Sequence, residues 1–420
     1  MSRAPELPRV LRGVLICLGP VLVGLYVAAT TFGGGTFRPW HPVMVDLEVY
    51  RSAGRVLLRG GDFYALPGSL QFLYPPFAAV LAVPLALLPA WLAQVGWTVA
   101  GVLALLAVLH RFGMHGWALS LLGTGCVWFV EPVVETLAFG QLGIFLVALV
   151  VLDLVPGPRV LRLGRDGGRL LPEGSLTALA AAVKLTPAIF VVYLLAVRRT
   201  RAFVAAVLTG LAVTLVSAVV APAASLGFWS RLAHGDTGLG HSIIYYTNQS
   251  AMADVVRVFG LGSAAAAGGL LLCAVVAVVG VWAAVRWHRA GDVMMAVNLC
   301  GVASLLASPV SWLHHFVWVV PLALSLARRA PGLPRLPGWF TALGWLFVGW
   351  VVASPFRRLP NGADVELTWS WGQNLLASTT LLLGVALLVA ALLVRFTLPQ
   401  HRHPARDEQG DVALVDRRQP

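Results

Sequence analysis

One lysine stands alone among the basic residues of this chain. Lys184 lies in the apolar stretch AAAVKLTPAIF, and the other 29 of the 30 Lys and Arg residues are arginines. An ionisable side chain within apolar sequence usually marks a substrate or ion path, which makes Lys184 a candidate ligand for an anionic group. The ordinary alternative is a lysine that anchors a helix end with its charge at the surface, but arginine does that elsewhere in this chain.

A carboxylate is the second candidate for chemistry. Helical periodicity extends from Val43 to Leu58, and Asp46 falls near its start, where the positive end of a helix favours an anion. Such an acid is most often a helix cap. The segment that contains Asp46 leads through the motif YPP into the next apolar run, and this context favours a functional role for Asp46. Glu48 completes the triplet DLE, but residues two apart on a helix do not face each other, so joint metal chelation is not favoured and Glu48 is a solvated loop acid in its ordinary interpretation.

A histidine pair is the third candidate. His314 and His315 lie in SWLHHFVW, at a turn between two apolar runs. Two histidines could bind a metal ion, but no third ligand with useful spacing accompanies them. We therefore expect no metal cofactor.

The elements that position these residues must be membrane helices. Hydrophobic residues make up 58% of the 420-residue chain, charged residues 11%, and the mean hydropathy is +0.82. A soluble core of this length could not bury so much apolar surface. The formal charge of +12 could suggest nucleic acid, but the arginines form short clusters between apolar runs, as in cytoplasmic loops of membrane proteins. We expect membrane lipids as partners and no nucleic acid.

The arginine clusters predict the topology. The segments expected in the cytoplasm are the N-terminus, 159–169, 198–201, 286–289, 328–335 and the tail after Arg395. Any two of them must be joined by an even number of crossings. This predicts spans near 202–222 and 261–285, a pair within 290–327 and a pair within 336–394. Both termini are then cytoplasmic, and most acids fall outside.

The stretch from 170 to 197 does not fit this rule with full spans. Both flanks are rich in arginine, yet only 28 residues lie between them, whereas two spans need about 40. We therefore predict a short helical hairpin broken at KLTP, because Pro187 cannot donate the helical hydrogen bond and disfavours helix in the residue before it. Lys184 would lie near the apex of this hairpin, facing protein or a water-filled cavity.

The remaining apolar runs complete an all-α bundle of about 12 transmembrane helices. Residues 76–110 predict a short proline-punctuated segment followed by a longer helix, and spans are expected near 117–131 and 139–155. Residues 1–396 form one membrane-embedded domain with a large first outer loop at 32–75. Residues 397–420 are polar and are predicted to be a disordered cytoplasmic tail.

Five blocks, in this order, resemble the polyprenol-phosphate-mannose-dependent mannosyltransferases of actinobacteria, which belong to the integral-membrane GT-C superfamily. The blocks are DLEVYRSAGRVLLRGGDFY…FLYPPFAAVLAVPLALLP, GQLGIFLVALVVLDL, GSLTALAAAVKLTPAIFVVYLLAVRR, YYTNQS and SPVSWLHHFVW. The resemblance extends from about residue 10 to 395.

The resemblance implies transfer of mannose from a polyprenyl-phosphate donor to a hydroxyl of a glycolipid or glycan acceptor, on the outer side of the plasma membrane. It maps the family's first-loop aspartate onto Asp46 as general base, and it assigns Lys184 and one of the two histidines to the donor phosphate or sugar. Because the leaving group is anionic, cationic or hydrogen-bonding partners are needed, and Arg257 is a second phosphate candidate beside its ordinary interpretation as a solvated arginine. Further residues that could line the same cavity are Glu48, Tyr74, Gln141, Tyr245, Tyr246, Asn248 and Gln249.

Two other classes of function remain open from the sequence. A transporter or flippase for an anionic lipid-linked sugar would also need a lone intramembrane lysine on a broken helix. Such a carrier would concentrate its polar groups near the bilayer midplane, whereas Asp46 is predicted at the outer surface. A non-catalytic scaffold would need neither Asp46 nor Lys184.

Overall fold

The structure, a computed structural model, describes residues 8–31, 44–66, 70–157, 162–163, 168–234, 240–327, 333 and 335–396. This part of the chain is helical apart from one antiparallel pair of two-residue strands, in which Arg162 pairs with Arg169 and Leu163 with Gly168. The predicted tail at 397–420 and part of the predicted outer loop at 32–75 lie outside the described residues.

Helices of very different lengths follow one another along the chain. In sequence order the elements are α1 (Arg9–Thr30), α2 (Val45–Leu58), α3 (Pro76–Leu87), α4 (Ala90–Arg111), α5 (Gly116–Phe129), α6 (Glu131–Phe139), α7 (Gly143–Leu154), β1 (Arg162–Leu163), β2 (Gly168–Arg169), α8 (Ser175–Val183), η1 (Thr186–Ala188), α9 (Ile189–Ala196), α10 (Thr200–Val220), α11 (Pro222–Ala233), η2 (Gly240–Ile244), α12 (Ala251–Phe259), α13 (Ser263–Arg289), α14 (Val293–Leu306), η3 (Leu313–Trp318), α15 (Val319–Ala327), α16 (Gly338–Ala353), η4 (Pro355–Arg358), η5 (Val365–Thr368) and α17 (Trp371–Leu393).

Six helices in the described ranges are long and apolar enough to cross a bilayer, namely α1, α4, α10, α13, α16 with its extension through η4, and α17. A seventh span results if α5 and α6, which are bent by 76° relative to each other, are counted as one. Five shorter apolar helical segments accompany them. The chain is therefore a multi-pass membrane protein by length and composition, and the expected number of about 12 membrane helices stays a prediction.

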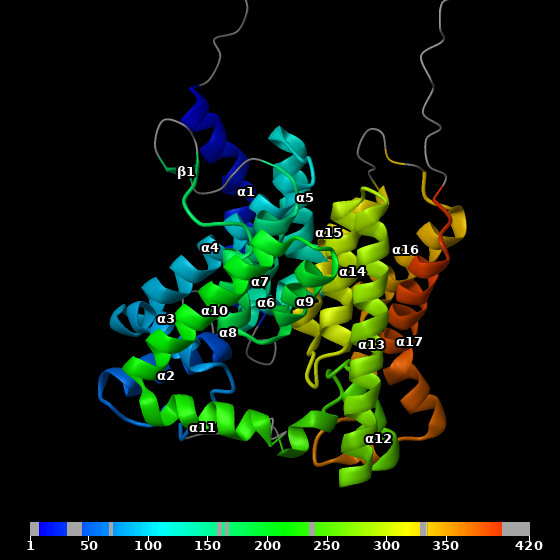
Figure 1. Ribbon diagram of the computed structural model, residues 1–420. Helices are drawn as coiled ribbons and strands as arrows, with labels where there is room; N and C mark the ends of the chain where they lie inside the picture. Colours follow the sequence, from blue (N-terminus) through cyan, green and yellow to red (C-terminus); the bar gives the residue numbers. More distant parts are fainter. Residues whose placement is uncertain are drawn as a thin grey trace, which may run out of the picture.

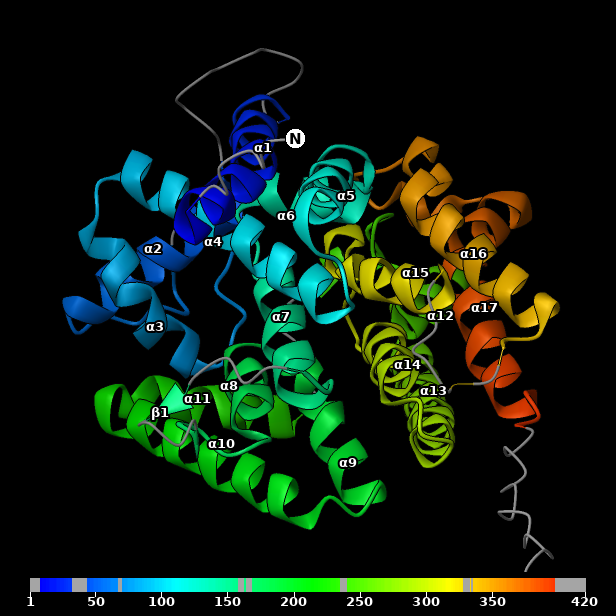
Figure 2. The same cartoon turned by 90° about the horizontal axis from the view of Figure 1, so that it is seen from above.

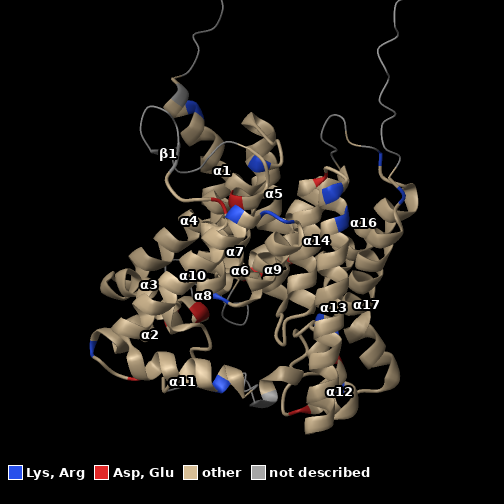
Figure 3. Ribbon diagram, viewed as in Figure 1, with Lys and Arg blue, Asp and Glu red and all other residues tan. Residues whose placement is uncertain are grey.

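The helices form one bundle with two distinct ends. In Figure 1, α1 begins and α17 ends at the upper side, whereas α2, α11 and α12 lie toward the lower side, with α11 running across the view. Figure 3 shows that most Lys and Arg positions lie over the upper part of the bundle. Seen from above, α8 to α11 lie together at one edge and α13 to α17 gather at another (Figure 2). Within the second group α14 is enclosed, with every residue from Met295 to Leu306 buried.

The helix break predicted at KLTP is confirmed. Helix α8 ends at Val183, Lys184 has extended backbone angles (φ −148°, ψ 129°), and Pro187 lies in the short helix η1 that leads into α9. The start of α8 is equally well defined. The Asp153 carboxylate accepts hydrogen bonds from the backbone N–H groups of Gly174 and Thr177 at 3.0 Å, so a side chain of α7 caps α8.

Gly174 explains why α8 can approach α10 so closely. Its φ is +95°, which L-residues with side chains rarely adopt, and a Cβ atom there would lie 2.1 Å from the Ala202 carbonyl oxygen of α10. Contact between the two helices at this point therefore requires glycine. Because α8 carries Lys184 at its far end, this contact and the Asp153 cap together fix the position of the lysine.

The segment between the spans predicted at 117–131 and 139–155 differs from expectation. Instead of a connection it contains a helix, α6, in which Pro132 occupies the first turn, where proline is tolerated. The helix ends at Gly140, which has a φ of +70°. A Cβ atom at Gly140 would lie 2.6 Å from Cβ of Leu47, so glycine allows the end of α6 to lie against α2.

Candidate functional site

Asp46 lies in the first turn of α2 and contacts the turn that follows α6. The buried residues Leu47 and Tyr50 hold the inner face of α2 against the bundle, and the Gln141 side chain is hydrogen-bonded to the Asp46 carboxylate. The backbone N–H of Gln141 donates to the Thr136 carbonyl oxygen at 2.8 Å, which closes the end of α6 behind Gly140. The predicted acid and the predicted amide are thus brought together by the Leu47–Gly140 contact.

Two tyrosines extend this polar cluster. The hydroxyl oxygen of Tyr50 lies 2.9 Å from that of Tyr74 and 3.0 Å from Oε1 of Gln141, whose side chain is only 3% exposed. Tyr74 belongs to the YPP motif, so the predicted outer loop at 32–75 contributes both Tyr50 and Tyr74 to the cluster. The network orients Gln141 with its oxygen toward the tyrosines, which leaves its amino group for the Asp46 carboxylate.

Lys184 contacts the ring of Tyr74. Its Nζ atom is 5.4 Å from the centroid of the Tyr74 ring and 2.5 Å from Nε2 of His315. Nδ1 of His315 accepts the backbone N–H of Trp312 at 3.1 Å. A neutral imidazole that accepts at Nδ1 carries its proton on Nε2, so Lys184 and His315 point two hydrogen-bond donors at the same place whenever the lysine is charged.

His314 belongs to a second group, which adjoins the first. The rings of His314 and His315 are perpendicular with centroids 4.5 Å apart, and Nδ1 of His314 lies 3.9 Å from Oε2 of Glu135. Arg357 pairs with Glu135 at 3.3 Å and also with Glu131. Within the described residues, Nε2 of His314 is buried and has no hydrogen-bond partner. The second group thus ends in an imidazole nitrogen that is able to bind a ligand.

The electrostatics of the site centre on Asp46. Burial disfavours its charged form, and the Gln141 hydrogen bond and the Lys184 charge oppose this effect, so the pKa of Asp46 is raised to about 6. A carboxyl group with this pKa is ionised near neutral pH and is still basic enough to take up a proton. The opposite charge of Lys184 acts on Asp46 within one cluster, which joins the two residues that the sequence singled out.

Glu48 is directed differently from Asp46. Its carboxylate pairs with Arg51 at 2.7 Å and also with Arg55 on the same helix, and its side chain is 53% exposed. Arg51 in turn donates to the carbonyl oxygens of Leu85 and Leu88 at the end of α3. The described residues contain no group of three or more His, Cys, Asp or Glu side chains that could hold a metal ion.

The YYTNQS segment lies against the loop that carries the histidines. Asn248 Oδ1 accepts the backbone N–H of Ser311 at 2.9 Å, and the N–H of Gln249 donates to the Ser311 carbonyl oxygen at 2.9 Å. The ring of Tyr245 is 5.9 Å from that of Trp312 and 4.7 Å from that of Tyr246. These contacts tie the segment to the turn before His314, with Asn248 and Gln249 as buried supports.

Arg257 is buried and is bonded to protein groups of its own neighbourhood. Its guanidinium pairs with Asp254 and donates to the Asn248 carbonyl oxygen at 2.8 Å, with its side chain 1% exposed. The arginine is therefore not solvated, and its contacts hold the loop that ends at Asn248. Its role toward a phosphate stays a prediction.

Two members of the clusters were not singled out by the sequence. No motif in the sequence marks Tyr50 as a site residue. Only the fold brings it to Gln141, which is 91 residues away. Glu135 carried a weak signal, because it is an acid within an otherwise apolar run, and burial beside His314 makes it part of the site.

Comparisons with known proteins identify the family to which the chain belongs. The family model described as Glycosyltransferase family 87 matches residues 72–309, which include Gln141 and Lys184 but neither Asp46 nor the histidine pair. The polyprenol-phosphate-mannose-dependent alpha-(1-2)-phosphatidylinositol mannoside mannosyltransferase of Mycobacterium tuberculosis is 30% identical in an alignment of 414 positions that covers 88% of this chain and 89% of the relative. The polyprenol-phosphate-mannose-dependent alpha-(1-2)-phosphatidylinositol pentamannoside mannosyltransferase of the same species is 35% identical in an alignment of 325 positions that covers 72% of this chain and 70% of the relative. No solved structure matches the chain significantly.

The apolar helices, the buried polar cluster and these similarities define an integral-membrane glycosyltransferase. Since the family match covers more than half of the chain, the protein belongs to glycosyltransferase family 87.

Proposed function

We propose that the protein transfers a mannosyl residue from a polyprenyl-phosphate donor to a hydroxyl of a glycolipid or glycan acceptor, with Asp46 as general base. The similar mannosyltransferases use this donor and phosphatidylinositol mannosides as acceptors, according to their names. The observation that carries the proposal is the placement of Asp46 and Lys184 in one cluster around Tyr74 and Gln141. The reaction needs a carboxylate beside the acceptor hydroxyl and a cation beside the leaving phosphate, and Asp46 and Lys184 are groups of these two kinds.

The reaction balances with these residues alone. The Asp46 carboxylate takes the proton of the acceptor hydroxyl, whose oxygen forms a bond to the anomeric carbon of the sugar. On the opposite face the bond from that carbon to the phosphate oxygen breaks, and polyprenyl phosphate leaves with the electron pair. Asp46 then releases its proton to water. Attack from the face opposite the leaving group inverts the anomeric centre.

Lys184 and His315 fit the leaving phosphate. In their present contact a charged lysine and the Nε2–H of His315 are both donors, so they share no favourable hydrogen bond. A phosphate oxygen at this position accepts from both groups. Donors already aimed at a developing negative charge stabilise the transition state without reorganisation. Oε2 of Glu135 lies 3.9 Å from Nδ1 of His314, and the ring of His314 packs perpendicular to that of His315. Glu135 and His314 thereby orient His315.

The proposed orientation in the plasma membrane places the termini in the cytoplasm and the active site outside. The supporting observation is the concentration of Lys and Arg at the end of the bundle where α1 begins and α17 ends (Figure 3). Helix α2, which carries Asp46, lies toward the other end (Figure 1).

Sugar transfer by purified full-length protein tests the function. The wild type is incubated with polyprenyl-phosphate mannose labelled in the sugar and with a phosphatidylinositol mannoside acceptor. Asp46→Asn is expected to lower kcat by about 10²- to 10⁴-fold while donor binding is retained, which is the range for loss of a general base. Asp62→Asn, which alters an exposed acid of the same segment, is the matched control. Wild-type transfer by Asp46→Asn would remove the base assignment, and absence of sugar transfer by the wild type would remove the proposed function.

A further inference from the structure

The two rings of the histidine pair lie in different electrostatic surroundings. Nδ1 of His315 accepts the backbone N–H of Trp312, so the proton of the neutral ring is on Nε2. Nδ1 of His314 instead faces a carboxylate, with 3.9 Å to Oε2 of Glu135. A carboxylate at this position favours the tautomer that carries the proton on Nδ1, and Nε2 of His314 is then an acceptor. The two neighbouring imidazoles therefore have opposite polarity at Nε2.

Both rings are held in the neutral state that this difference requires. His314 and His315 are buried, with 7% and 6% of their surface exposed. The charge of Lys184 acts on both rings, so a further positive charge on either of them is disfavoured. Each ring thus has one protonated and one free nitrogen atom.

Helix α6 fixes the orientation of His314. Oγ1 of Thr136 lies 2.7 Å from the His314 carbonyl oxygen, and the Phe139 ring lies 5.2 Å from the imidazole. Glu135 belongs to the same helix, and its other carboxylate oxygen pairs with Arg357 at 3.3 Å. The Glu135 side chain is only 10% exposed, so water screens its charge little. One helix thus holds both the backbone of His314 and the carboxylate that faces its ring.

Nε2 of His314 is the atom that this arrangement leaves for a ligand. The side chain is 9% exposed, and within the described residues Nε2 is buried without a hydrogen-bond partner. An acceptor nitrogen cannot bind the phosphodiester group of a lipid-linked sugar, because that group also carries no proton near neutral pH. It can bind an O–H group, and a sugar carries several.

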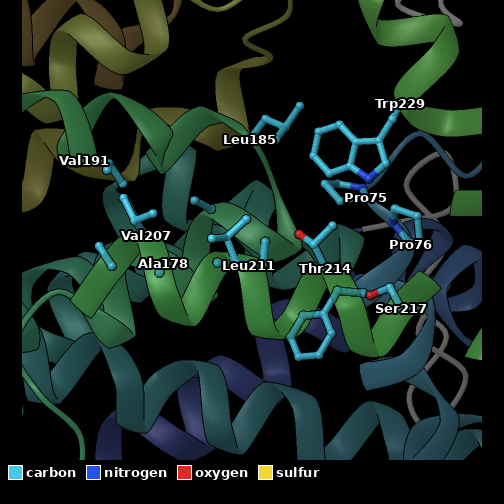
Figure 4. A pocket seen from close by; sticks show the side chains of 15 residues that line it. Pro75, Pro76, Ala178, Leu185, Val191, Val207, Leu211, Thr214, Ser217 and Trp229 are labelled. Atoms are coloured by element: carbon cyan, nitrogen blue, oxygen red, sulfur yellow. The ribbon is translucent and has the colours of Figure 1, made fainter. Parts of the chain in front are cut away.

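The apolar cavity shown in Figure 4 offers no comparable partner for a sugar. Among the described side chains that line it, only Thr214, Ser217 and Trp229 carry polar atoms. The Ser217 hydroxyl already donates to the Val213 carbonyl oxygen of its own helix at 2.8 Å. A sugar in this cavity would leave most of its hydroxyls unpaired, which is costly.

We propose that Glu135 keeps His314 in its acceptor form, so that the histidine pair recognises two different groups. His315 donates to the leaving phosphate, and Nε2 of His314 accepts a hydrogen bond from a sugar hydroxyl. The inference rests on the proposed function, which supplies the sugar and assigns the phosphate to His315. The hydroxyl belongs to the transferred sugar or to the acceptor, since both offer the same O–H group. Glu135 acts through His314 and is a positioning residue.

The protons on the two rings can be located by NMR. Full-length protein is prepared with histidine carrying an NMR-active nitrogen isotope, because protonated and free ring nitrogens differ strongly in chemical shift. The signals are assigned by their loss in His314→Gln and His315→Gln. We expect the proton on Nδ1 in His314 and on Nε2 in His315. A proton on Nε2 of His314 in the wild type overturns the proposal.

Glu135→Gln tests what sets the tautomer. The amide N–H of the new side chain is able to donate to Nδ1, so the His314 proton should move toward Nε2. Glu131→Gln removes the other acid paired with Arg357 and is the matched control, in which both rings should keep the wild-type signals. An unchanged His314 spectrum in Glu135→Gln overturns the role of Glu135.

Binding measurements identify the sugar. Kd is determined separately for polyprenyl-phosphate mannose and polyprenyl phosphate, and for a phosphatidylinositol mannoside and phosphatidylinositol. His314→Leu should raise Kd about tenfold for one of the two mannosylated lipids and leave both sugar-free lipids unchanged. The affected lipid shows whether the hydroxyl belongs to the transferred sugar or to the acceptor. An equal loss for polyprenyl phosphate and its mannosylated form, or no loss for any lipid, overturns the proposal.

Analogues that lack single hydroxyls make the test independent of how a variant folds. With the wild type, one deoxymannose form of the affected lipid should bind about tenfold more weakly than the parent, and equal binding of all forms overturns the proposal. None of these measurements needs sugar transfer. A protein that transfers no sugar can still show the expected tautomers and hydroxyl dependence, whereas a confirmed transferase with the opposite tautomer of His314 contradicts this inference alone.

Discussion

Nζ of Lys184 and Nε2 of His315 lie 2.5 Å apart in the structure, although 131 residues separate them in the chain. The backbone N–H of Trp312 fixes the acceptor nitrogen of His315 on the far side of the ring. The lysine and the imidazole N–H therefore form a pair of donors, and the pair becomes fully satisfied when an anion lies between them.

A double-mutant cycle tests the pair. Lys184→Met and His315→Gln are each expected to lower kcat/KM by about 10²-fold, because each removes one donor to the leaving phosphate. The double variant should lose much less than the product of the two effects, since the two donors act on one oxygen. His288→Gln, which alters a histidine paired with Tyr193 instead, is the control. Fully multiplicative losses would show that the two residues act independently.

The pH dependence of kcat/KM follows from Asp46. Its pKa is raised to about 6 by burial, and a general base must be ionised to act. Activity should therefore fall about tenfold per pH unit below pH 6. It should fall again above about pH 7, because burial lowers the pKa of Lys184 to about 7 and the lysine must be charged to bind the phosphate. In Gln141→Leu the hydrogen bond that lowers this pKa is lost, so the acid limb should move to higher pH. A limb near pH 4 in the wild type, or no movement in the variant, contradicts this role of the pair.

Glu135 is expected to orient His314. The Glu135→Gln variant removes the charge beside Nδ1 of His314, and kcat/KM should fall about tenfold, equivalent to about 1.4 kcal/mol of transition-state stabilisation. Glu131→Gln removes the other acid paired with Arg357 and should change kcat/KM little, because Glu131 does not contact the histidine in the described structure. Equal losses in both variants would instead indicate that the Arg357 pairing supports the fold.

Asp153 is expected to stabilise helix α8, which Lys184 directly follows. Asp153→Ala leaves the N–H groups of Gly174 and Thr177 at the start of α8 without their acceptor, at a cost of about 1–3 kcal/mol. Thermal unfolding of the purified protein should show a lower Tm, whereas Asp62→Ala, in an exposed loop, should not. An unchanged Tm for Asp153→Ala would mean that other contacts hold α8.

The sequence predicted long apolar helices such as α10 and α13. The break at KLTP was predictable because two arginine-rich flanks left too few residues for two full spans, and the structure has this break between α8 and η1. Helix α6 was not predicted, because nine residues with two acids are too short and too polar to resemble a span. Gly140 at its end allows the close contact with α2.

The candidate site was only partly accessible from sequence. Asp46, Lys184 and the histidines are unusual residues in apolar surroundings, so their types alone made them candidates. Tyr50 and Glu135 acquire their partners only through contacts between distant segments. The burial of Arg257 had a local signal, since Asp254 lies three residues before it and side chains at this spacing face each other on a helix.

The contact between Gly140 and Leu47 links the alignment of the candidate site to the shape of the turn after α6. A side chain at position 140 would lie too close to Leu47 for α2 to keep its place, so a substitution there would shift Asp46 relative to Gln141 without removing either residue. Activity could then be lost while every polar side chain of the site is still present, because the acid and its amide partner come from different parts of the chain.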